Sequence, residues 1–139
     1  SMTFETNGTQ ELSNDFKNWV ESIDTEIFFS CSPKLWSVAG EKASKAIKPE
    51  TVAEYYNLSK TGQLKFVVGH KEEHWKEMEG VISQFRKAGV MWPVWVMPVG
   101  AREEEQHATA GAVAEKAFKR GYNVAARVHV YLFGNAIGT

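Results

Sequence analysis

The stretch LKFVVGHKEEHWKEMEGVISQFRKAGVMWPVWVM, residues 64–97, decides the fold that we expect for this chain. It opens with the apolar run 64–68 and closes with the apolar run 94–97, and both have the length of a strand. Large apolar residues recur between them at helical spacing, namely Trp75, Met78, Ile82 and Phe85. A strand, a helix and a second strand in this order predict a βαβ unit with parallel strands.

The same alternation continues on both sides of this unit. Further strands are expected at residues 3–5, 27–29 and 128–133, and further helices at residues 12–23, 49–58 and 101–120. The pattern predicts one α/β domain over residues 3–139, with a mostly parallel sheet of about five strands. Helices on one face would make a partial βα barrel, whereas helices on both faces would make a doubly wound sheet. The apolar character of the central strands favours burial on both faces.

Local signals mark the ends of the helices. Ser13 and Asn14 are candidate caps, Pro49 suits a first helical turn, and Gly121 suits a C-cap. In the last helix Val113, Ala117 and Phe118 are expected to face inward. Between residues 32 and 48 we expect a loose connection, and residues 1–2 resemble a cloning remnant.

Composition excludes several classes of protein. The chain has 139 residues, with 16 basic and 17 acidic side chains and a formal net charge of -1, which argues against a nucleic-acid surface. No apolar run approaches the roughly 20 residues that span a bilayer, so a cytoplasmic location is expected. The single cysteine, Cys31, excludes an internal disulfide and an iron–sulfur cluster held by this chain alone.

Function in parallel sheets of this kind sits at the carboxyl ends of the strands. The stretches that fall there are residues 6–9, 32–34, 69–70, 97–100 and 134–135. In the second of these, Pro33 fixes an extended backbone, so that Ser32 and Lys34 present a hydroxyl and an ammonium together. Such a pair suits a carboxylate or a ribose, and a plain turn with a surface lysine is the alternative.

The strand end at residues 97–100 has no ionisable side chain and offers backbone groups to a flat ligand. Its members are Met97, Pro98, Val99 and Gly100, of which the glycine permits a close approach. A simple strand-to-helix turn is the alternative.

Four further residues invite a chemical hypothesis. His70 and His74 in HKEEH match a zinc-hydrolase motif, although acidic residues in a first helical turn are explained by the helix dipole alone. Cys31 could be a nucleophile, but a small buried thiol is favoured. His129 lies in the alternating run RVHVYLFGN, residues 127–135, on the face that also carries Arg127. It is either a functional residue or a core histidine whose polar groups are satisfied.

In chain order, the stretches ETNGT, SPK, LKFVV, MPVG, RGY and RVHVYLFGN resemble the C-terminal half of the 7-carboxy-7-deazaguanine synthase family. These are radical S-adenosylmethionine enzymes of queuosine and 7-deazapurine biosynthesis, and the resemblance covers residues 5–135. It implies a partial barrel in which S-adenosylmethionine contacts Ser32, Pro33 and Lys34 together with residues 97–100. It also implies that His129 contacts the substrate, 6-carboxy-5,6,7,8-tetrahydropterin.

The resemblance places the [4Fe-4S] cluster and the magnesium site of the family in an N-terminal half that this sequence does not contain. The chain alone is therefore expected to be inactive, and to pair with that half or with a second copy of itself. The alternative is a non-enzymatic half-barrel that binds an adenosine-like or pterin-like ligand or complements a partner chain.

Overall fold

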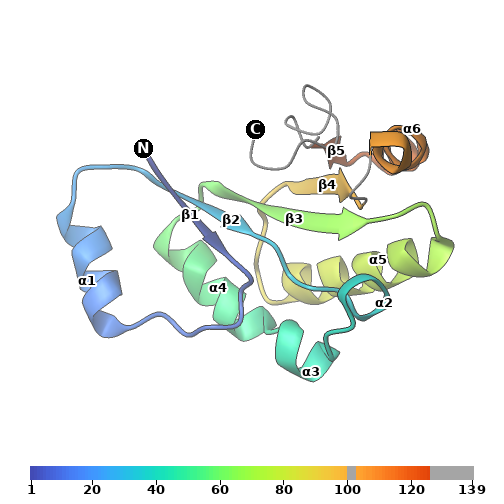
Figure 1. The fold of residues 1–139 in the computed structure, drawn as a ribbon. Coiled ribbons are helices and arrows are strands. Elements are labelled where there is room, and N and C mark those ends of the chain that lie inside the picture. The colour runs from blue at the N-terminus through green and yellow to red at the C-terminus, as the bar shows by residue number, and fades with distance from the viewer. Residues whose placement is uncertain (100–102, 126–139) are drawn as a thin grey trace.

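The computed structural model describes residues 1–99 and 103–125, and for residues 103–109 it describes the backbone alone. In this part of the chain, five strands form one parallel sheet in the order β1-β2-β3-β4-β5 (Figure 1). The strands are β1 (Met2–Thr6), β2 (Ile27–Cys31), β3 (Gly62–Val68), β4 (Val94–Pro98) and β5 (Asn123–Val124). This order contains no reversal of the kind that a doubly wound sheet requires. The α/β fold expected from the sequence is confirmed, and it is compatible with a partial βα barrel.

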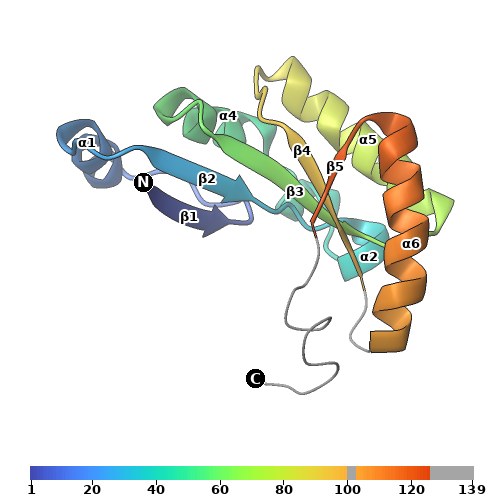
Figure 2. The ribbon, with the colours of Figure 1, turned by 90° about the horizontal axis from the view of Figure 1, so that it is seen from above.

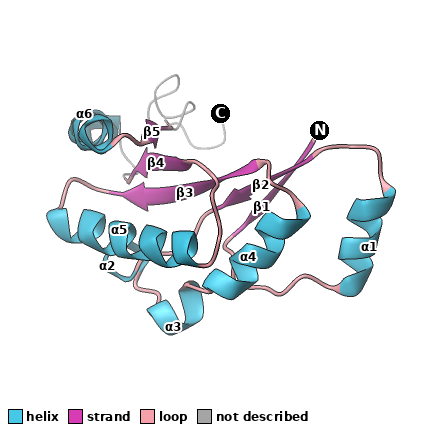
Figure 3. Cartoon of the chain, turned by 180° about the vertical axis from the view of Figure 1, so that it is seen from behind, coloured by secondary structure: helices cyan, strands magenta, loops and turns pink. Residues whose placement is uncertain are grey.

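The helices connect the strands and pack on one face of the sheet. They are α1 (Asn14–Ser22), α2 (Trp36–Ala39), α3 (Ala43–Ala46), α4 (Pro49–Leu58), α5 (Glu72–Lys87) and α6 (Glu103–Arg120). Figure 2 shows α6 beside the β4–β5 edge, and Figure 3 shows α4 and α5 together beneath the sheet. None of the helices in the described part of the chain is long and apolar enough to cross a membrane.

Among the described residues, the two faces of the central strands are buried unequally. Along β3 the side chains alternate between buried and half-buried, with Leu64 and Phe66 fully buried and Lys65 and Val67 half-buried. The helices therefore cover one face, while the other face is covered less by the described residues. Val67 is apolar, yet it points to the less covered face, because successive side chains of a strand point to opposite faces. The apolar residues of β3 therefore do not all lie on the face that the helices cover.

Several local predictions are confirmed. The Ser13 hydroxyl accepts a hydrogen bond from the backbone N–H of Phe16 at 3.1 Å, which caps α1. The helix expected at residues 49–58 is α4, with Pro49 in its first turn. In α5, Trp75 and Phe85 are completely buried, as the helical spacing predicts.

Other local predictions fail. Phe118 is 73% exposed, whereas Val113 and Ala117 are buried, so the inner face of α6 follows the i, i+4 pair and excludes the aromatic ring. Strand β1 begins at Met2, which pairs with Ile27 of β2, so it starts one residue earlier than expected. The expected loose connection contains α2 and α3. The strand expected at residues 128–133 lies outside the described residues, and the fifth described strand is β5.

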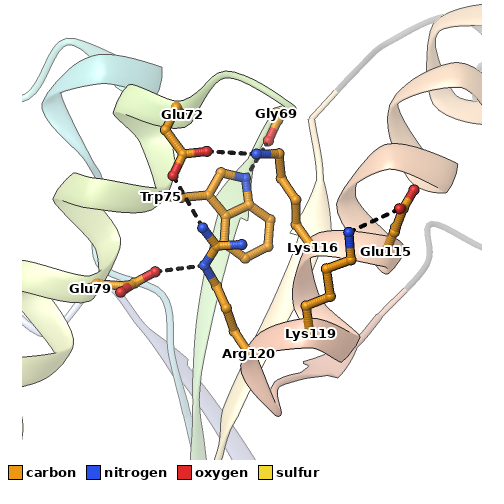
Figure 4. Close-up of polar contacts among 8 residues, drawn as sticks. All are labelled: Gly69, Glu72, Trp75, Glu79, Glu115, Lys116, Lys119 and Arg120. Carbon is orange, nitrogen blue, oxygen red and sulfur yellow. Dashed lines mark hydrogen bonds and ion pairs between the residues drawn. The ribbon is translucent and has the colours of Figure 1, made fainter.

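Charged side chains fasten α6 to α5 (Figure 4). Glu72 accepts hydrogen bonds from Lys116 at 2.7 Å and from Arg120 at 3.1 Å, and Glu79 accepts one from Arg120 at 2.8 Å. The Arg120 guanidinium also lies 5.0 Å from the ring centre of Trp75. One arginine thus joins the buried core of α5 to its charged surface.

This cluster predicts an acid-dependent stability. The hydrogen bond from Lys116 lowers the pKa of Glu72 from its ordinary value of 4.5, against an opposing effect of desolvation. A carboxylate with a lowered folded-state pKa contributes stability above its unfolded-state pKa, and this contribution is lost as the pH falls through the folded-state value. We therefore expect Glu72→Gln to lower the melting temperature at pH 7 and to leave little difference from the wild type once the pH is well below 4.5.

The control for this experiment is Glu73→Gln. Glu73 is exposed in the same first turn of α5 and has no ion pair in the described part of the chain. A gap between wild type and Glu72→Gln that stays constant with pH would contradict the account.

Candidate functional site

A groove of about 360 Å³ opens on the face of the sheet that the helices leave uncovered, at the carboxyl ends of the strands. The register of strand pairing places the residues that form the floor of the groove side by side. Glu5 lies beside Ser30 on the neighbouring strand, and Val67 lies beside Met97. Lys65 precedes Val67 by two residues and so shares its face. The floor thus combines a carboxylate, an ammonium, a hydroxyl and apolar groups.

The loop after β1 forms one rim of the groove. The Asn7 side-chain oxygen accepts hydrogen bonds from the backbone N–H of Thr9 at 3.1 Å and from its hydroxyl at 2.7 Å. Gly8 has a φ of 78°, and a Cβ atom there would lie 2.8 Å from Val52 and 2.9 Å from the sulfur of Cys31. The turn therefore requires glycine, and it presents the amide of Asn7 at the groove.

The loop after β2 forms the second rim. The backbone N–H of Ser32 donates to the carbonyl oxygen of Thr6 at 2.8 Å, which extends the β1–β2 pairing by one residue. Pro33 is buried, while Ser32 and Lys34 line the groove and Lys34 is exposed. The extended backbone that Pro33 favours thus places the hydroxyl and the ammonium on the same side. The sequence-based grouping of Ser32 with Lys34 agrees with this geometry.

In the described part of the chain, the end of β4 contributes Met97 to the groove. Met97 lines the groove, Pro98 is buried, and the backbone N–H of Val99 donates to the carbonyl oxygen of Val68 at 2.9 Å. Of the described residues 97–99, Met97 is the one that lines the groove. Gly100 and His129 lie outside the described residues.

Gly69, which follows β3, is held by α5 and is not among the residues that line the groove. The Nδ1 atom of His74 accepts a hydrogen bond from the backbone N–H of Gly69 at 2.9 Å, and the indole N–H of Trp75 donates to the carbonyl oxygen of Gly69 at 3.0 Å. His74 is buried, whereas His70 precedes the helix and is exposed. In the described ranges, no three His, Cys, Asp or Glu side chains gather as metal ligands. The zinc hypothesis gains no support, because His74 is buried and its Nδ1 atom accepts a hydrogen bond from the backbone of Gly69.

Cys31 is a buried structural thiol. It is 1% exposed, and burial raises its pKa to about 12. Nucleophiles and cluster ligands are thiolates, so Cys31 suits neither role. The cluster therefore does not fit this residue. Magnesium, which prefers several oxygen ligands, finds a single carboxylate, Glu5, among the described residues that line the groove.

Four groove residues lie outside the stretches that the sequence selected, namely Glu5, Ser30, Lys65 and Val67. Strict alternation along residues 62–68 could have located Lys65, because it falls out of phase with the buried residues Leu64 and Phe66. The side-chain amide of Gln63 donates to the Ser30 hydroxyl at 2.9 Å. This hydrogen bond joins two strands, so the sequence of neither strand alone predicts it.

Comparison of the chain with protein-family models, with curated proteins and with solved structures finds no match.

Proposed function

We propose that this chain is the C-terminal portion of a radical S-adenosylmethionine enzyme like 7-carboxy-7-deazaguanine synthase, and that its groove binds S-adenosylmethionine. One observation carries the proposal. Ser32, Lys34 and Met97, three of the residues that the resemblance assigns to this ligand, line the same groove although they come from two different strand ends. In the whole enzyme, bound S-adenosylmethionine supplies the deoxyadenosyl radical that starts conversion of 6-carboxy-5,6,7,8-tetrahydropterin to 7-carboxy-7-deazaguanine.

The chemical groups of the groove suit such a ligand. The Lys34 ammonium pairs with a carboxylate, and the Ser32 hydroxyl and Asn7 amide donate hydrogen bonds to a carboxylate or a ribose. The Glu5 carboxylate pairs with an amino group, and Met97 packs against a flat ring. In this proposal the residues bind and orient the ligand, and the sheet excludes water from one side of it.

Further parts of the proposal involve groups beyond the groove. We propose that His129 contacts the pterin. The cluster and magnesium require ligands from another chain or segment, because Cys31 does not fit a cluster, and the chain alone binds without turnover. In the described sheet β1 is an edge strand, so pairing with that segment or with a second copy is proposed. A sedimentation coefficient that stays monomeric at all concentrations would contradict self-pairing.

A non-enzymatic binding module is the second candidate. The observation that favours it is the same buried thiol of Cys31, which gives this chain no ligand for the cluster on which the chemistry depends. The module would use the same groove for an adenosine-like or pterin-like ligand, or would supply it to a partner chain. Turnover on addition of a cluster-bearing partner separates the enzyme from a simple binding module.

Lys34→Ala tests the proposed site. Loss of a charged hydrogen-bond donor costs about 1.5–3 kcal/mol, so the affinity for S-adenosylmethionine is expected to fall by roughly 10-fold to 100-fold. Isothermal titration calorimetry measures it. The matched control is Lys87→Ala, which removes an exposed lysine at the far end of α5 and should bind like the wild type. Equal affinities for wild type and Lys34→Ala would refute the site.

A further inference from the structure

The Glu77 carboxylate on α5 accepts hydrogen bonds from the first residues of the short helix α2. Glu77 accepts hydrogen bonds from the backbone N–H of Trp36 at 2.6 Å, from the backbone N–H of Ser37 at 2.8 Å and from the Ser37 hydroxyl at 2.6 Å. Both oxygens of the carboxylate are used. Glu77 follows Trp36 by 41 positions in the sequence, so this is a tertiary contact and not a local cap.

Helix α2 depends on this contact. It has four residues, and its N-cap position, Leu35, supplies no side-chain hydrogen bond. A helix of one turn is unstable alone, because nucleation fixes several backbone angles for very few hydrogen bonds. Its first N–H groups also need acceptors from outside the helix. Glu77 provides these acceptors, and its negative charge lies at the positive end of the helix.

The helix that Glu77 holds begins next to the groove. Lys34 is followed by the buried Leu35, and α2 begins one residue later. Val38 and Ala39 of α2 line a second hollow of about 130 Å³, which shares Ser32, Lys34 and Val67 with the main groove. A shift of α2 would therefore move the backbone that carries Lys34 and one wall beside it.

We propose that Glu77 is a positioning residue for the groove. By fixing the start of α2, it fixes the segment that carries Lys34 and so sets the affinity for an anionic ligand group, although it does not touch the ligand itself. The proposal rests on the proposed function for the identity of the ligand. Its structural half, that Glu77 orders residues 34–40, does not depend on any ligand.

The binding experiment compares Glu77→Ala, Glu77→Gln and the control Glu73→Ala with S-adenosylmethionine as the probe. Glu77→Ala is expected to weaken binding about five-fold to ten-fold, which is the range of one ordinary hydrogen bond and less than the loss expected for Lys34→Ala. Glu77→Gln keeps one acceptor oxygen but turns an amide toward the N–H of Trp36, so a smaller loss is expected. It also serves as the test variant if Glu77→Ala does not fold.

A double-mutant cycle separates positioning from simple stabilisation. If Glu77 acts through Lys34, the double variant Lys34→Ala/Glu77→Ala binds no more weakly than Lys34→Ala. Fully additive losses, or an unchanged affinity in Glu77→Ala, would overturn the positioning role. Glu73→Ala should bind like the wild type, because the hydrogen bonds from α5 to α2 in the described residues all go to Glu77.

Amide hydrogen exchange tests the ordering without a ligand. The backbone N–H groups of Ala39 and Gly40 donate to the carbonyl oxygens of Leu35 and Trp36. Glu77→Ala is expected to speed their exchange at least ten-fold and to shift the amide resonance of Lys34. Equal exchange in wild type and Glu77→Ala would overturn the inference. If the wild type does not bind S-adenosylmethionine, the proposed function fails, and the exchange result still decides the role of Glu77.

Discussion

Trp75→Ala is expected to lower the free energy of unfolding by about 3–5 kcal/mol, as truncation of a large buried aromatic residue does. Trp75 is completely buried in α5, and its indole N–H donates to the carbonyl oxygen of Gly69 at 3.0 Å. The ring also packs beneath the guanidinium of Arg120. The change therefore removes buried volume from the core, the hydrogen bond to Gly69 after β3 and the contact with Arg120 of α6. Denaturant unfolding measures the loss.

Trp75→Phe separates these contributions. It keeps an aromatic ring but leaves the carbonyl of Gly69 without its indole donor, which costs about 1–3 kcal/mol. A loss for Trp75→Ala no greater than that for Trp75→Phe would contradict the packing of α5 described above.

Gly62→Ala is the second substitution with a large expected effect. A Cβ atom at this position would lie 2.6 Å from the carbonyl oxygen of Phe29 and 2.7 Å from the indole of Trp92. The carbonyl belongs to β2, which pairs with Gly62, and Trp92 is 1% exposed, so neither neighbour can move easily. Overpacking of this kind costs about 3 kcal/mol, at the upper end of the usual range.

Gly80→Ala is the matched control. Gly80 lies inside α5, is exposed, and would place its Cβ atom with nothing within 4 Å. Alanine there should raise the free energy of unfolding by about 0.5–1 kcal/mol, because glycine is a poor helix former. If Gly62→Ala were as well tolerated as Gly80→Ala, that result would contradict the close packing of β2 and Trp92 against Gly62.

The parts of the fold that the sequence predicts well are those encoded locally. Helix α4 begins at Pro49, as a proline in a first turn indicates, and α5 carries its large apolar residues at helical spacing. Ser13 caps α1 from within its own first turn. In each case a short window of sequence contains the whole physical reason for the element.

The parts that were missed depend on distant residues. Helix α2 has no side-chain hydrogen bond at its N-cap, and the acceptors for its first N–H groups come from Glu77 on another helix. The exposure of Phe118 follows from the side on which α6 meets α5, where Lys116 and Arg120 reach Glu72. No window around residue 36 or 118 contains these partners, and only the assembled fold supplies them.

The candidate site divides in the same way. The rule that parallel strands place function at their carboxyl ends selected Ser32, Lys34 and Met97, which share the groove. Glu5 and Lys65 were missed because they lie within strands, and their position depends on which face the helices cover. Strand pairing then brings both to the groove.

The most direct test of the central claim is a nuclear magnetic resonance titration of the isotope-labelled chain with S-adenosylmethionine. The account predicts that amide shifts concentrate at Asn7, Ser32, Lys34 and Met97, around the groove, and that they disappear in Lys34→Ala. Absence of shifts at saturating ligand would contradict it. So would shifts confined to the separate hollow between α1 and α4, lined by Lys17 and Glu54.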